Sequence, residues 1–450
     1  MMYDLAIIGA GPGGYEAALY AAKKNLKVVL IEKDLIGGTC LNRGCIPTKA
    51  ILSSAKAYRL MKSAGKFGIE ISEGSLSLSY EKVMARKDSI VDINRKALEG
   101  QLRKAGITLV FGSAKIIDVT SISVTGQPDP ITARYVIVAT GTRTANIGNI
   151  EIDHKDILSS DDILSSQELP ESMIIMGGGV MGCEFAFIFA EFGVNVTVVE
   201  AQDFLLPLED HDLSTLVLRE MKKKKIKVLT GKKIEKIEHS ASGINIIDSD
   251  GALHSAQKLL VTVGRRKITD NLGLIETGIT LDKQGSIAVN DYMQTSVPTI
   301  YAVGDVSGKK MVAHVAAEQG RSVIDHILGV PRKINYKNVP MSIFTIPEIG
   351  SVGLTENELI NVHLPYVSKQ YLYRSLGKAQ AEDEIVGLFK ILFEPESGVI
   401  LGVHIMGEHA SDIIMEAAIA METSITVSAF TNVIHAHPTY AEGLRLTMLE

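Results

Sequence analysis

The stretch that decides the fold runs from residue 4 to residue 32 and reads DLAIIGAGPGGYEAALYAAKKNLKVVLIE. An apolar run, a glycine-rich turn, a segment with helical periodicity and a second apolar run predict one strand–turn–helix–strand unit. The turn matches the spacing G-x-G-x-x-G at Gly9, Gly11 and Gly14. These glycines allow a tight turn, close backbone approach to a pyrophosphate and close packing of helix on strand, and Glu32 can accept hydrogen bonds from a ribose. The stretch therefore predicts a dinucleotide site.

The same pattern returns at residues 171–201, which read ESMIIMGGGVMGCEFAFIFAEFGVNVTVVEA. Its glycines are Gly177, Gly179 and Gly182, and its acid is Glu200, as far from the first glycine as in the first unit. A single G-x-G-x-x-G is a weak signal, whereas two in the same context are a strong one. Two dinucleotide sites in one chain predict electron transfer between two dinucleotides.

A pair of cysteines follows the first unit directly, in the stretch 37–50, GGTCLNRGCIPTKA. The chain has three cysteines, which are too few for a secreted disulfide framework, and no nearby ligands suggest zinc, so no metal is expected. Pro47 favours the first turn of a helix, which would place Cys45 near a helix N-terminus, where the dipole lowers the pKa of a thiol. We expect Cys40 and Cys45 to cycle between disulfide and dithiol.

Composition excludes other classes of protein. The 450 residues are 46% hydrophobic and 22% charged, with a net charge of −6, which argues against nucleic acid as a partner. The amino-terminal segment has no basic region ahead of an apolar run, so no signal peptide is expected. No stretch is apolar for long enough to suggest a membrane span. We expect a cytoplasmic location.

Three further apolar runs end in glycine, and the last of them places Asp305 just after a strand. They are 134–144 (RYVIVATGTRT), 258–266 (KLLVTVGRR) and 299–308 (TIYAVGDVSG). From about residue 333 the pattern changes to antiparallel strands and amphipathic helices without a glycine fingerprint. The basic run 222–225 is expected to be a solvated helix end. The fold class expected is α/β, with two Rossmann-like domains and an α+β C-terminal domain.

The motifs together resemble the pyridine nucleotide–disulfide oxidoreductases, and within them the dihydrolipoamide dehydrogenase branch. The resemblance covers essentially the whole chain and rests on GAGPGG, GGTCLNRGCIPTKA, VIVATG, GGGVMGCE, YAVGDV, PEIGSVGLTE and HAHPTYAE. It implies a homodimer with four domains. These are an FAD domain (1–142), an NAD domain (143–264), a central domain completing the FAD site (265–333) and an interface domain (334–450).

The resemblance also implies the cofactor residues. Those expected to bind FAD are Gly9, Gly11, Gly13, Gly14, Glu32, Lys33, Gly38, Thr39, Lys49, Ala114, Ala139, Thr140, Gly141, Asp305, Met311, Ala313 and His314. Those expected to bind NAD are Gly177, Gly179, Val180, Gly182, Glu184, Glu200, Ile234 and Gly264. Two departures stand out: Arg43 lies between the cysteines where relatives often have an apolar residue, and Ala114 replaces a frequent glycine. Cys183 is expected to be a small buried residue.

The stretch HAHPTYAEGLR suggests a base. Pro438 restricts His437 to extended geometry and is expected to begin the last helix, and Glu442 can reach back to the imidazole. A carboxylate that orients one ring nitrogen leaves the other free to take a thiol proton. His435 is the weaker candidate.

The resemblance assigns the remaining roles. Cys40 would be the thiol that meets substrate and Cys45 the thiol against the flavin, with Lys49 and Glu184 as an ion pair beside it.

The function expected is reoxidation of protein-bound dihydrolipoamide to lipoamide, with hydride passed through FAD to NAD⁺. The partners implied are the lipoyl domains and acyltransferase core of a 2-oxoacid dehydrogenase or glycine cleavage complex. Two alternatives remain. A glutathione reductase-like enzyme would commonly use NADPH, but Glu200 and the absence of a following arginine disfavour a 2′-phosphate. A non-catalytic flavoprotein scaffold is disfavoured because the cysteines, His437 and Glu442 are all present.

Overall fold

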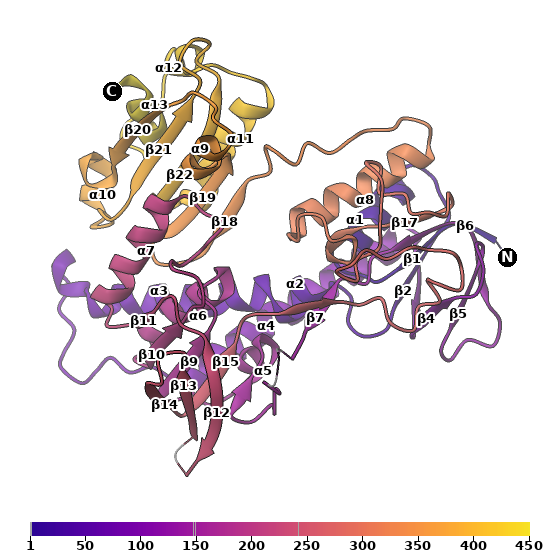
Figure 1. The fold of residues 1–450 in the computed structure, drawn as a ribbon, viewed down its shortest axis with the longest axis horizontal. Helices are drawn as coiled ribbons and strands as arrows, with labels where there is room; N and C mark the ends of the chain where they lie inside the picture. The colour runs from indigo at the N-terminus through magenta and orange to yellow at the C-terminus, as the bar shows by residue number, and fades with distance from the viewer. Residues whose placement is uncertain (1, 147, 149, 242) are drawn as a thin grey trace.

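A computed structural model describes residues 2–146, 148, 150–241 and 243–450 (Figure 1). The first part is built on a seven-stranded sheet in the order β3-β2-β1-β6-β5-β4, with β17 added beside β6. Strands β1, β2, β3, β6 and β17 are parallel, so their carboxyl ends lie at one edge. The strands are β1 (Met2–Ile8), β2 (Val28–Glu32), β3 (Thr108–Phe111), β4 (Ala114–Ile116), β5 (Ser121–Val124), β6 (Ile131–Val138) and β17 (Ile300–Ala302).

The second part contains a five-stranded parallel sheet in the order β11-β10-β9-β15-β8 and a small antiparallel sheet, β12-β13-β14. Its strands are β8 (Ile157–Leu158), β9 (Ser172–Met176), β10 (Asn195–Val199), β11 (Lys227–Leu229), β12 (Ile234–Ser240), β13 (Gly243–Asp248), β14 (Leu253–Ala256) and β15 (Lys258–Val261). Its helices are α5 (Ser160–Ser165), α6 (Val180–Glu191) and α7 (His211–Lys223). A two-stranded ribbon, β7 (Thr142–Thr144) with β16 (Arg265–Lys267), connects the two parts.

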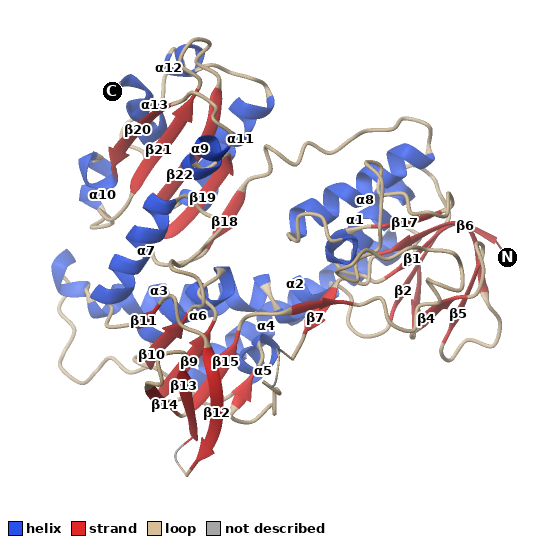
Figure 2. Cartoon of the chain, in the orientation of Figure 1, coloured by secondary structure: helices blue, strands red, loops and turns tan. Residues whose placement is uncertain are grey.

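The third part is a five-stranded antiparallel sheet, β18-β19-β22-β21-β20, with helices around it (Figure 2). Its strands are β18 (Met341–Ile343), β19 (Glu348–Gly353), β20 (Val367–Leu372), β21 (Leu388–Phe393) and β22 (Ile400–Gly407). Its helices are α9 (Glu356–Asn361), α10 (Gly377–Ala381), α11 (Ala410–Glu422), α12 (Val427–Thr431) and α13 (Glu442–Leu449). The predicted fold class, two Rossmann-like units and an α+β C-terminal part, is confirmed.

The remaining helices cover the first part or lead from it to the second. They are α1 (Pro12–Lys23), α2 (Gly38–Arg43), α3 (Cys45–Lys62), α4 (Tyr80–Lys104) and α8 (Ala313–Ile327), together with short 3₁₀ turns that include η2 (Gly304–Ser307). Helix α8 lies along α1 (Figure 1), and a Cβ on Gly320 would come within 2.6 Å of the Gly13 carbonyl oxygen. Residues 265–333 were expected to form a central domain, and β17 and α8 from this range complete the first sheet and its helical cover. The four domain boundaries stay a prediction.

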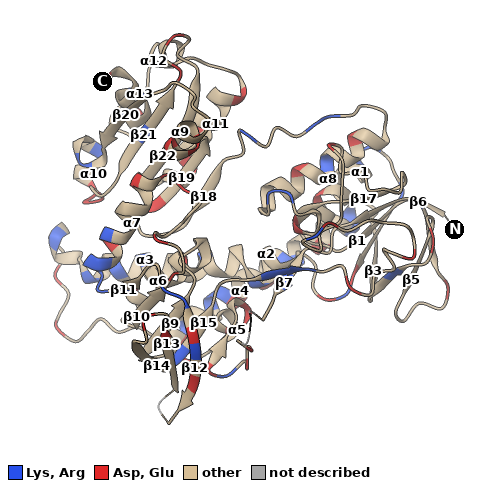
Figure 3. Ribbon diagram, in the orientation of Figure 1, with Lys and Arg blue, Asp and Glu red and all other residues tan. Residues whose placement is uncertain are grey.

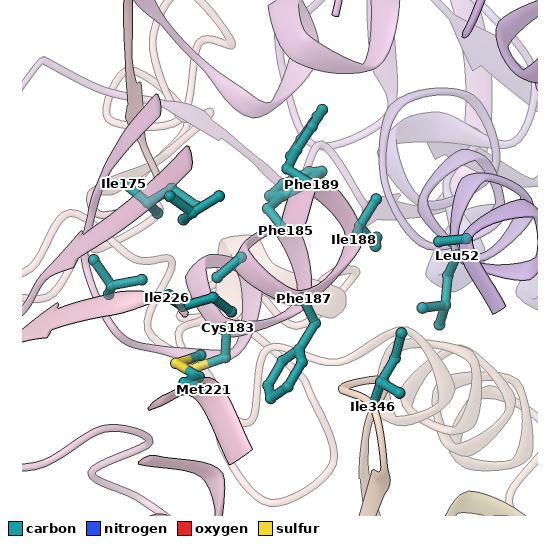
Figure 4. Close-up of a cluster of buried hydrophobic side chains, with 14 of the residues drawn as sticks. Leu52, Ile175, Cys183, Phe185, Phe187, Ile188, Phe189, Met221, Ile226 and Ile346 are labelled. Atoms are coloured by element: carbon teal, nitrogen blue, oxygen red, sulfur yellow. The ribbon is translucent and has the colours of Figure 1, made fainter. Parts of the chain in front are cut away.

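Helix α6 is the centre of the largest apolar core. Nine of its twelve residues are buried, which is the pattern of a helix enclosed on all sides. Figure 4 shows Phe187 and Ile188 of α6 on the side that faces Leu52 of α3 and Ile346, while Ile175 of β9 lies on the opposite side. The helix that follows the second glycine turn is therefore packed against α3, which begins at Cys45, and against the C-terminal sheet.

Lys and Arg residues are interspersed with Asp and Glu residues along the chain (Figure 3). The ribbon β7–β16 is one of the basic stretches, with Arg143 and Arg266 both paired to Asp270. Within the part of the chain that the structure describes, no helix combines the length and the apolar character needed to cross a bilayer.

The predicted helix start near the cysteines is confirmed, whereas that of the last helix is wrong. Helix α3 begins at Cys45, because Gly44 (φ −147°, ψ −111°) breaks the preceding helix, and Pro47 lies in its first turn, where the missing N–H costs nothing. The last helix begins at Glu442 and not at Pro438, since residues 437–440 form a non-helical turn whose Thr439 hydroxyl accepts the Glu442 N–H at 3.2 Å.

Candidate active site

The first glycine turn forms a cradle at the carboxyl end of β1. Gly9 has φ +104°, which a side chain would strain, and a Cβ on Gly14 would lie 1.8 Å from the Gly9 carbonyl oxygen. Glu32, at the end of β2, accepts the Ala10 N–H at 2.7 Å. Gly11 is the N-cap of α1 and offers no side-chain cap, so the start of this helix is open to an anion.

The second glycine turn repeats this geometry at the carboxyl end of β9. Gly177 has φ +108°, and a Cβ on Gly182 would lie 1.9 Å from the Gly177 carbonyl oxygen. Glu200, just after β10, accepts the Gly178 N–H at 2.5 Å and the Gln202 N–H at 2.7 Å. Helix α6 begins at Gly179, again without a side-chain cap. Both cradles thus offer uncapped amide donors to a pyrophosphate and a fixed carboxylate to a ribose, which is what FAD and NAD require.

The other predicted cofactor residues gather around the same sheet edges. Those near the first cradle follow β6 and β17, begin β4, or lie at the starts of α2 and α8; they are Ala139, Thr140, Gly141, Asp305, Ala114, Gly38, Thr39, Met311, Ala313 and His314, with Lys33 next to Glu32. Those near the second cradle follow β15, begin α6 or begin β12; they are Gly264, Val180 and Ile234. Their role in binding stays a proposal.

Asp305 is held by a partner that no local pattern indicates. The Thr142 hydroxyl donates to Asp305 Oδ2 at 2.8 Å, and Arg265 Nε donates to the Thr142 hydroxyl at 2.7 Å. Thr142 is 4% exposed. The ribbon β7–β16 therefore fixes the carboxylate expected to meet the flavin side chain.

The cysteines lie on either side of the break between α2 and α3. Both are free thiols here; Cys40 is half-buried and Cys45 is exposed. A hydrogen bond from the Cys40 thiol lowers the pKa of Cys45 to about 7, desolvation by the groups packed around its sulfur opposes this, and the Lys49 ammonium adds to the lowering. The same bond, with burial, raises the pKa of Cys40. The structure thus stabilises a thiolate at Cys45 and a thiol at Cys40.

Lys49 and Glu184 form the predicted ion pair. Lys49 Nζ donates to both carboxylate oxygens, at 3.0 and 2.9 Å, although the residues are far apart in sequence. The Glu184 side chain is 6% exposed and that of Lys49 is 30% exposed. Since Lys49 lies one helical turn after Cys45 and Glu184 lies on α6, this pair joins the thiols to the second cradle.

Two further residues singled out in the sequence, Arg43 and Cys183, lie next to the cysteine and glycine motifs. Arg43 forms an ion pair with Asp34, which lies in the loop after Glu32. Cys183 is fully buried, as predicted, and burial raises the pKa of its thiol. A third redox thiol is not supported by this position, because thiol exchange needs access.

His437 and Glu442 are in contact. His437 Nδ1 lies 2.9 Å from Glu442 Oε2, and the imidazole is 75% exposed whereas the carboxylate is 13% exposed. Glu442 is fixed further by the Thr439 N–H at 3.1 Å. His435 contacts the Val433 carbonyl at 3.1 Å through Nδ1 and Glu416 Oε1 at 2.9 Å through Nε2, and its side chain is only 6% exposed, so a substrate thiol has less access to it than to His437.

The histidine pair and the cysteines are not brought together within one chain. His437 is tied to Glu442, the first residue of α13, and Figure 1 shows α13 at the outer side of the C-terminal sheet, well apart from α2. The chain as described therefore holds the thiols and the candidate base in separate places.

One group of possible metal ligands lies elsewhere. The ligand atoms of Asp153, Asp156 and His239 are all within 4.8 Å of one another. Lys258 Nζ already neutralises Asp156 at 2.8 Å, and Asp153 Oδ1 accepts three backbone N–H groups, those of residues 155–157, at 2.8 Å each. The cluster is explained by these contacts, and no metal is assigned to it.

Comparison with known proteins gives a family over most of the chain. The description "pyridine nucleotide-disulphide oxidoreductase" matches residues 3–320, and its dimerisation domain matches residues 339–448. A dihydrolipoyl dehydrogenase of Chlamydia muridarum is 38% identical over 443 residues, which is 98% of this chain and 95% of that protein. One of Bacillus subtilis is 38% identical over 460 residues, 98% of this chain and 96% of that protein.

Solved structures agree. LpdA from Mycobacterium tuberculosis superimposes with a TM-score of 0.93 at 28% identity, covering 99% of this chain and 98% of that one. The HOCl-induced flavoprotein disulfide reductase RclA from Escherichia coli superimposes with a TM-score of 0.89 at 26% identity, covering 99% of each chain.

Proposed function

Because the chain belongs to the pyridine nucleotide–disulphide oxidoreductase family, we propose that it reoxidises protein-bound dihydrolipoamide and passes the hydride to NAD⁺. The resemblance expected from the motifs is confirmed. The protein is an FAD-dependent disulfide oxidoreductase that uses NAD(H), and its C-terminal part is a dimerisation domain.

The observation that carries the proposal is the position of the thiol pair between the two cradles. At its start, α2 touches the first cradle, since a Cβ on Gly38 would lie 2.6 Å from the Gly11 Cα. Beyond the cysteines, Lys49 of α3 pairs with Glu184, two residues after the last glycine of the second cradle. The dithiol thus lies on a segment that contacts both dinucleotide sites.

The chemistry of the chain follows from the thiols. The Cys40–Cys45 disulfide is attacked at the Cys40 sulfur by one substrate thiolate, the bond between the two cysteines breaks, and Cys45 leaves as the thiolate that its low pKa favours. The second substrate thiol displaces Cys40, so the substrate leaves as a disulfide with two electrons removed. His437, oriented by Glu442, takes the proton of the attacking thiol. FAD, when bound, supplies a two-electron acceptor that passes hydride to NAD⁺.

We place His437 in the active site of the opposite subunit. Within one chain its helix lies apart from α2, and the dimerisation domain that carries it meets a second copy. A two-fold contact is reciprocal, so each dimer would contain two shared sites. The proposed substrates are lipoyl domains on the acyltransferase core of a 2-oxoacid dehydrogenase, or those of a glycine cleavage complex. The cytoplasmic location stays a prediction.

An activity panel tests the substrate. We expect turnover of dihydrolipoamide with NAD⁺ to exceed, by orders of magnitude, turnover of glutathione disulfide with NADH or NADPH. A preference for glutathione disulfide would replace this proposal by the glutathione reductase-like alternative. A purified protein whose flavin is not bleached by NADH would support the scaffold alternative.

A further inference from the structure

A third residue, from the C-terminal part, holds the Lys49–Glu184 pair. Phe344 lies between β18 and β19, and its backbone N–H donates to Glu184 Oε1 at 2.9 Å. Its ring lies against the Lys49 ammonium, with Nζ 4.3 Å from the ring centroid. One residue therefore contacts both the cation and the anion of the pair.

We propose that Phe344 is a positioning residue, whose ring and amide fix the Lys49 ammonium and the Glu184 carboxylate relative to each other and to the Cys45 thiol. The inference rests on the proposed redox role of Cys45. It makes the dimerisation domain a part of the thiol site through its backbone and one aromatic ring, in addition to the histidine proposed to come from the opposite subunit.

The amide of Phe344 acts on the anion of the pair, and its ring acts on the cation. Glu184 Oε1 is shared between Phe344 N–H and Lys49, and Oε2 is bound by Lys49 alone, so the carboxylate cannot rotate without losing a donor. The Lys49 side chain is 30% exposed and has water as an alternative partner. The negative face of the ring offsets this by attracting the ammonium toward the site.

The backbone of Phe344 is firmly fixed. The nearby Ile343 and Ile346 are 0% and 1% exposed. Figure 4 shows Ile346 close to Leu52 of α3 and to Phe187 of α6. Lys56, two turns after Lys49, donates to Glu348 at 2.7 Å. Replacing the ring by an aliphatic side chain should therefore leave the amide in place and remove only the contact with the ammonium.

The sign of the effect follows from the charges around Cys45. Lys49 favours the thiolate and Glu184 disfavours it. Without the ring, the ammonium spends more time in water and the thiolate loses part of its stabilisation. A cation–π contact at a half-exposed site corresponds to a rise of about 0.5 unit in the pKa of the Cys45 thiol, or about a threefold loss of thiolate when the pH is below that pKa.

The test follows alkylation of Cys45 by iodoacetamide as a function of pH. The holoenzyme is reduced, freed of reductant and reacted anaerobically, and the modified cysteines are identified by peptide mass spectrometry. Buried Cys183 serves as an internal control that should not react. We expect Phe344→Leu and Phe344→Met to raise the apparent pKa by about 0.5 unit. Phe344→Tyr, which keeps the ring, should match the wild type. Phe393→Leu, a half-buried phenylalanine of β21, should also leave the pKa unchanged.

A double variant separates positioning from packing. In a Lys49→Met background the Phe344→Leu change should shift the pKa no further, because the ring acts through the ammonium. A shift that persists in that background, or a wild-type pKa in both Phe344→Leu and Phe344→Met, overturns the inference while leaving the proposed function intact. A wild-type Cys45 that titrates near 8.5, the ordinary value for a thiol, overturns both.

Discussion

Replacing Lys390 by methionine should destabilise the protein far more than replacing an exposed lysine such as Lys378. Lys390 lies on β21 with its side chain 1% exposed, and its ammonium lies 2.8 Å from Asp210, 2.7 Å from Asp212 and 2.6 Å from Glu356. Asp210 and Asp212 belong to the start of α7 in the second part, whereas Glu356 begins α9 in the third. One buried cation therefore connects the NAD part to the dimerisation domain.

The size of the stability loss follows from the burial of the carboxylates that remain when the Lys390 ammonium is removed. Methionine has a similar shape, so the loss is that of the cation, and Asp210, 1% exposed on its side chain, is left facing two other carboxylates. Removing one partner of a buried ion pair costs about 3–5 kcal/mol. With an unfolding entropy of about 2.1 cal/mol/K per residue, this corresponds to about 3–5 °C if the whole chain unfolds together, and to more than about 10 °C if the dimerisation domain unfolds alone.

Thermal unfolding at fixed protein and FAD concentrations measures this. Lys378→Met is the matched control, since Lys378 pairs with Glu382 at 2.5 Å but both side chains are about two-fifths exposed, at 38% and 40%. The Lys378→Met variant should lose no more than about 0.5 kcal/mol of unfolding free energy. A triple variant, Lys390→Met with Asp210→Asn and Glu356→Gln, should recover part of the stability because the buried negative charges are gone.

The pH dependence gives a second check. Burial is the largest single influence on Asp210 and opposes its ionisation, but the hydrogen bond and charge of Lys390, the charge of His404 and the Glu356 N–H together outweigh burial and hold the pKa of that carboxyl below its usual value. A carboxylate with a lowered pKa stabilises the fold above its unfolded pKa of about 3.9, and this contribution is lost as the pH falls through the folded pKa. The difference in stability between wild type and Lys390→Met should therefore be largest at neutral pH and should become smaller below about pH 4. A melting temperature for Lys390→Met as close to wild type as that of Lys378→Met, at neutral pH, would refute the reasoning.

Four further predictions concern the reaction. Steady-state kinetics should show NADH preferred over NADPH by about 100-fold or more in kcat/KM, because the fixed Glu200 carboxylate repels a 2′-phosphate; equal values would remove the NAD assignment. In alkylation assays Cys40→Ala should raise the pKa of Cys45 from about 7 toward its ordinary value, and Lys49→Met should raise it less; an unchanged pKa in Cys40→Ala would contradict the hydrogen bond as the main cause. Rapid mixing should show that His437→Ala slows oxidation of the dithiol by about 100-fold while reduction by NADH changes little; equal losses would make His437 structural. A mixed dimer of one Cys40→Ser and one His437→Ala subunit should regain one working site, whereas both parent homodimers are nearly inactive; no recovered activity would place the site within one subunit.

Much of the chemistry depends on local features that the sequence determines by itself. The glycine turns require positive φ at Gly9 and Gly177 and no Cβ at Gly14 and Gly182, and only glycine satisfies these conditions. The acids that follow by a fixed spacing end the next strand (Glu32) or directly follow it (Glu200), so their place beside each turn is set by the strand–turn–helix–strand unit itself. The contact between His437 and Glu442 spans five residues and is predictable on the same local grounds.

Reasoning from propensity is weakest at two elements of the C-terminal part. Strand β20 carries little local indication of a strand, because it is an edge strand with every second residue exposed and includes Ser368, Lys369 and Gln370. The start of the last helix was misplaced because the Thr439 cap and the contact of Glu442 with His437 favour a turn where the proline alone suggested a helix.

Only the tertiary structure decided which distant residues surround the thiols. Lys49 is 135 residues from Glu184, and Glu184 is 160 residues from Phe344, so no periodicity connects them. The ring of Phe344 and the buried ammonium of Lys390 are placed by the packing of α6, α3 and the C-terminal sheet into common cores. Closing such long loops costs entropy that only the combined burial of these elements offsets. For this reason, the contacts between these distant residues form only when the whole chain is folded.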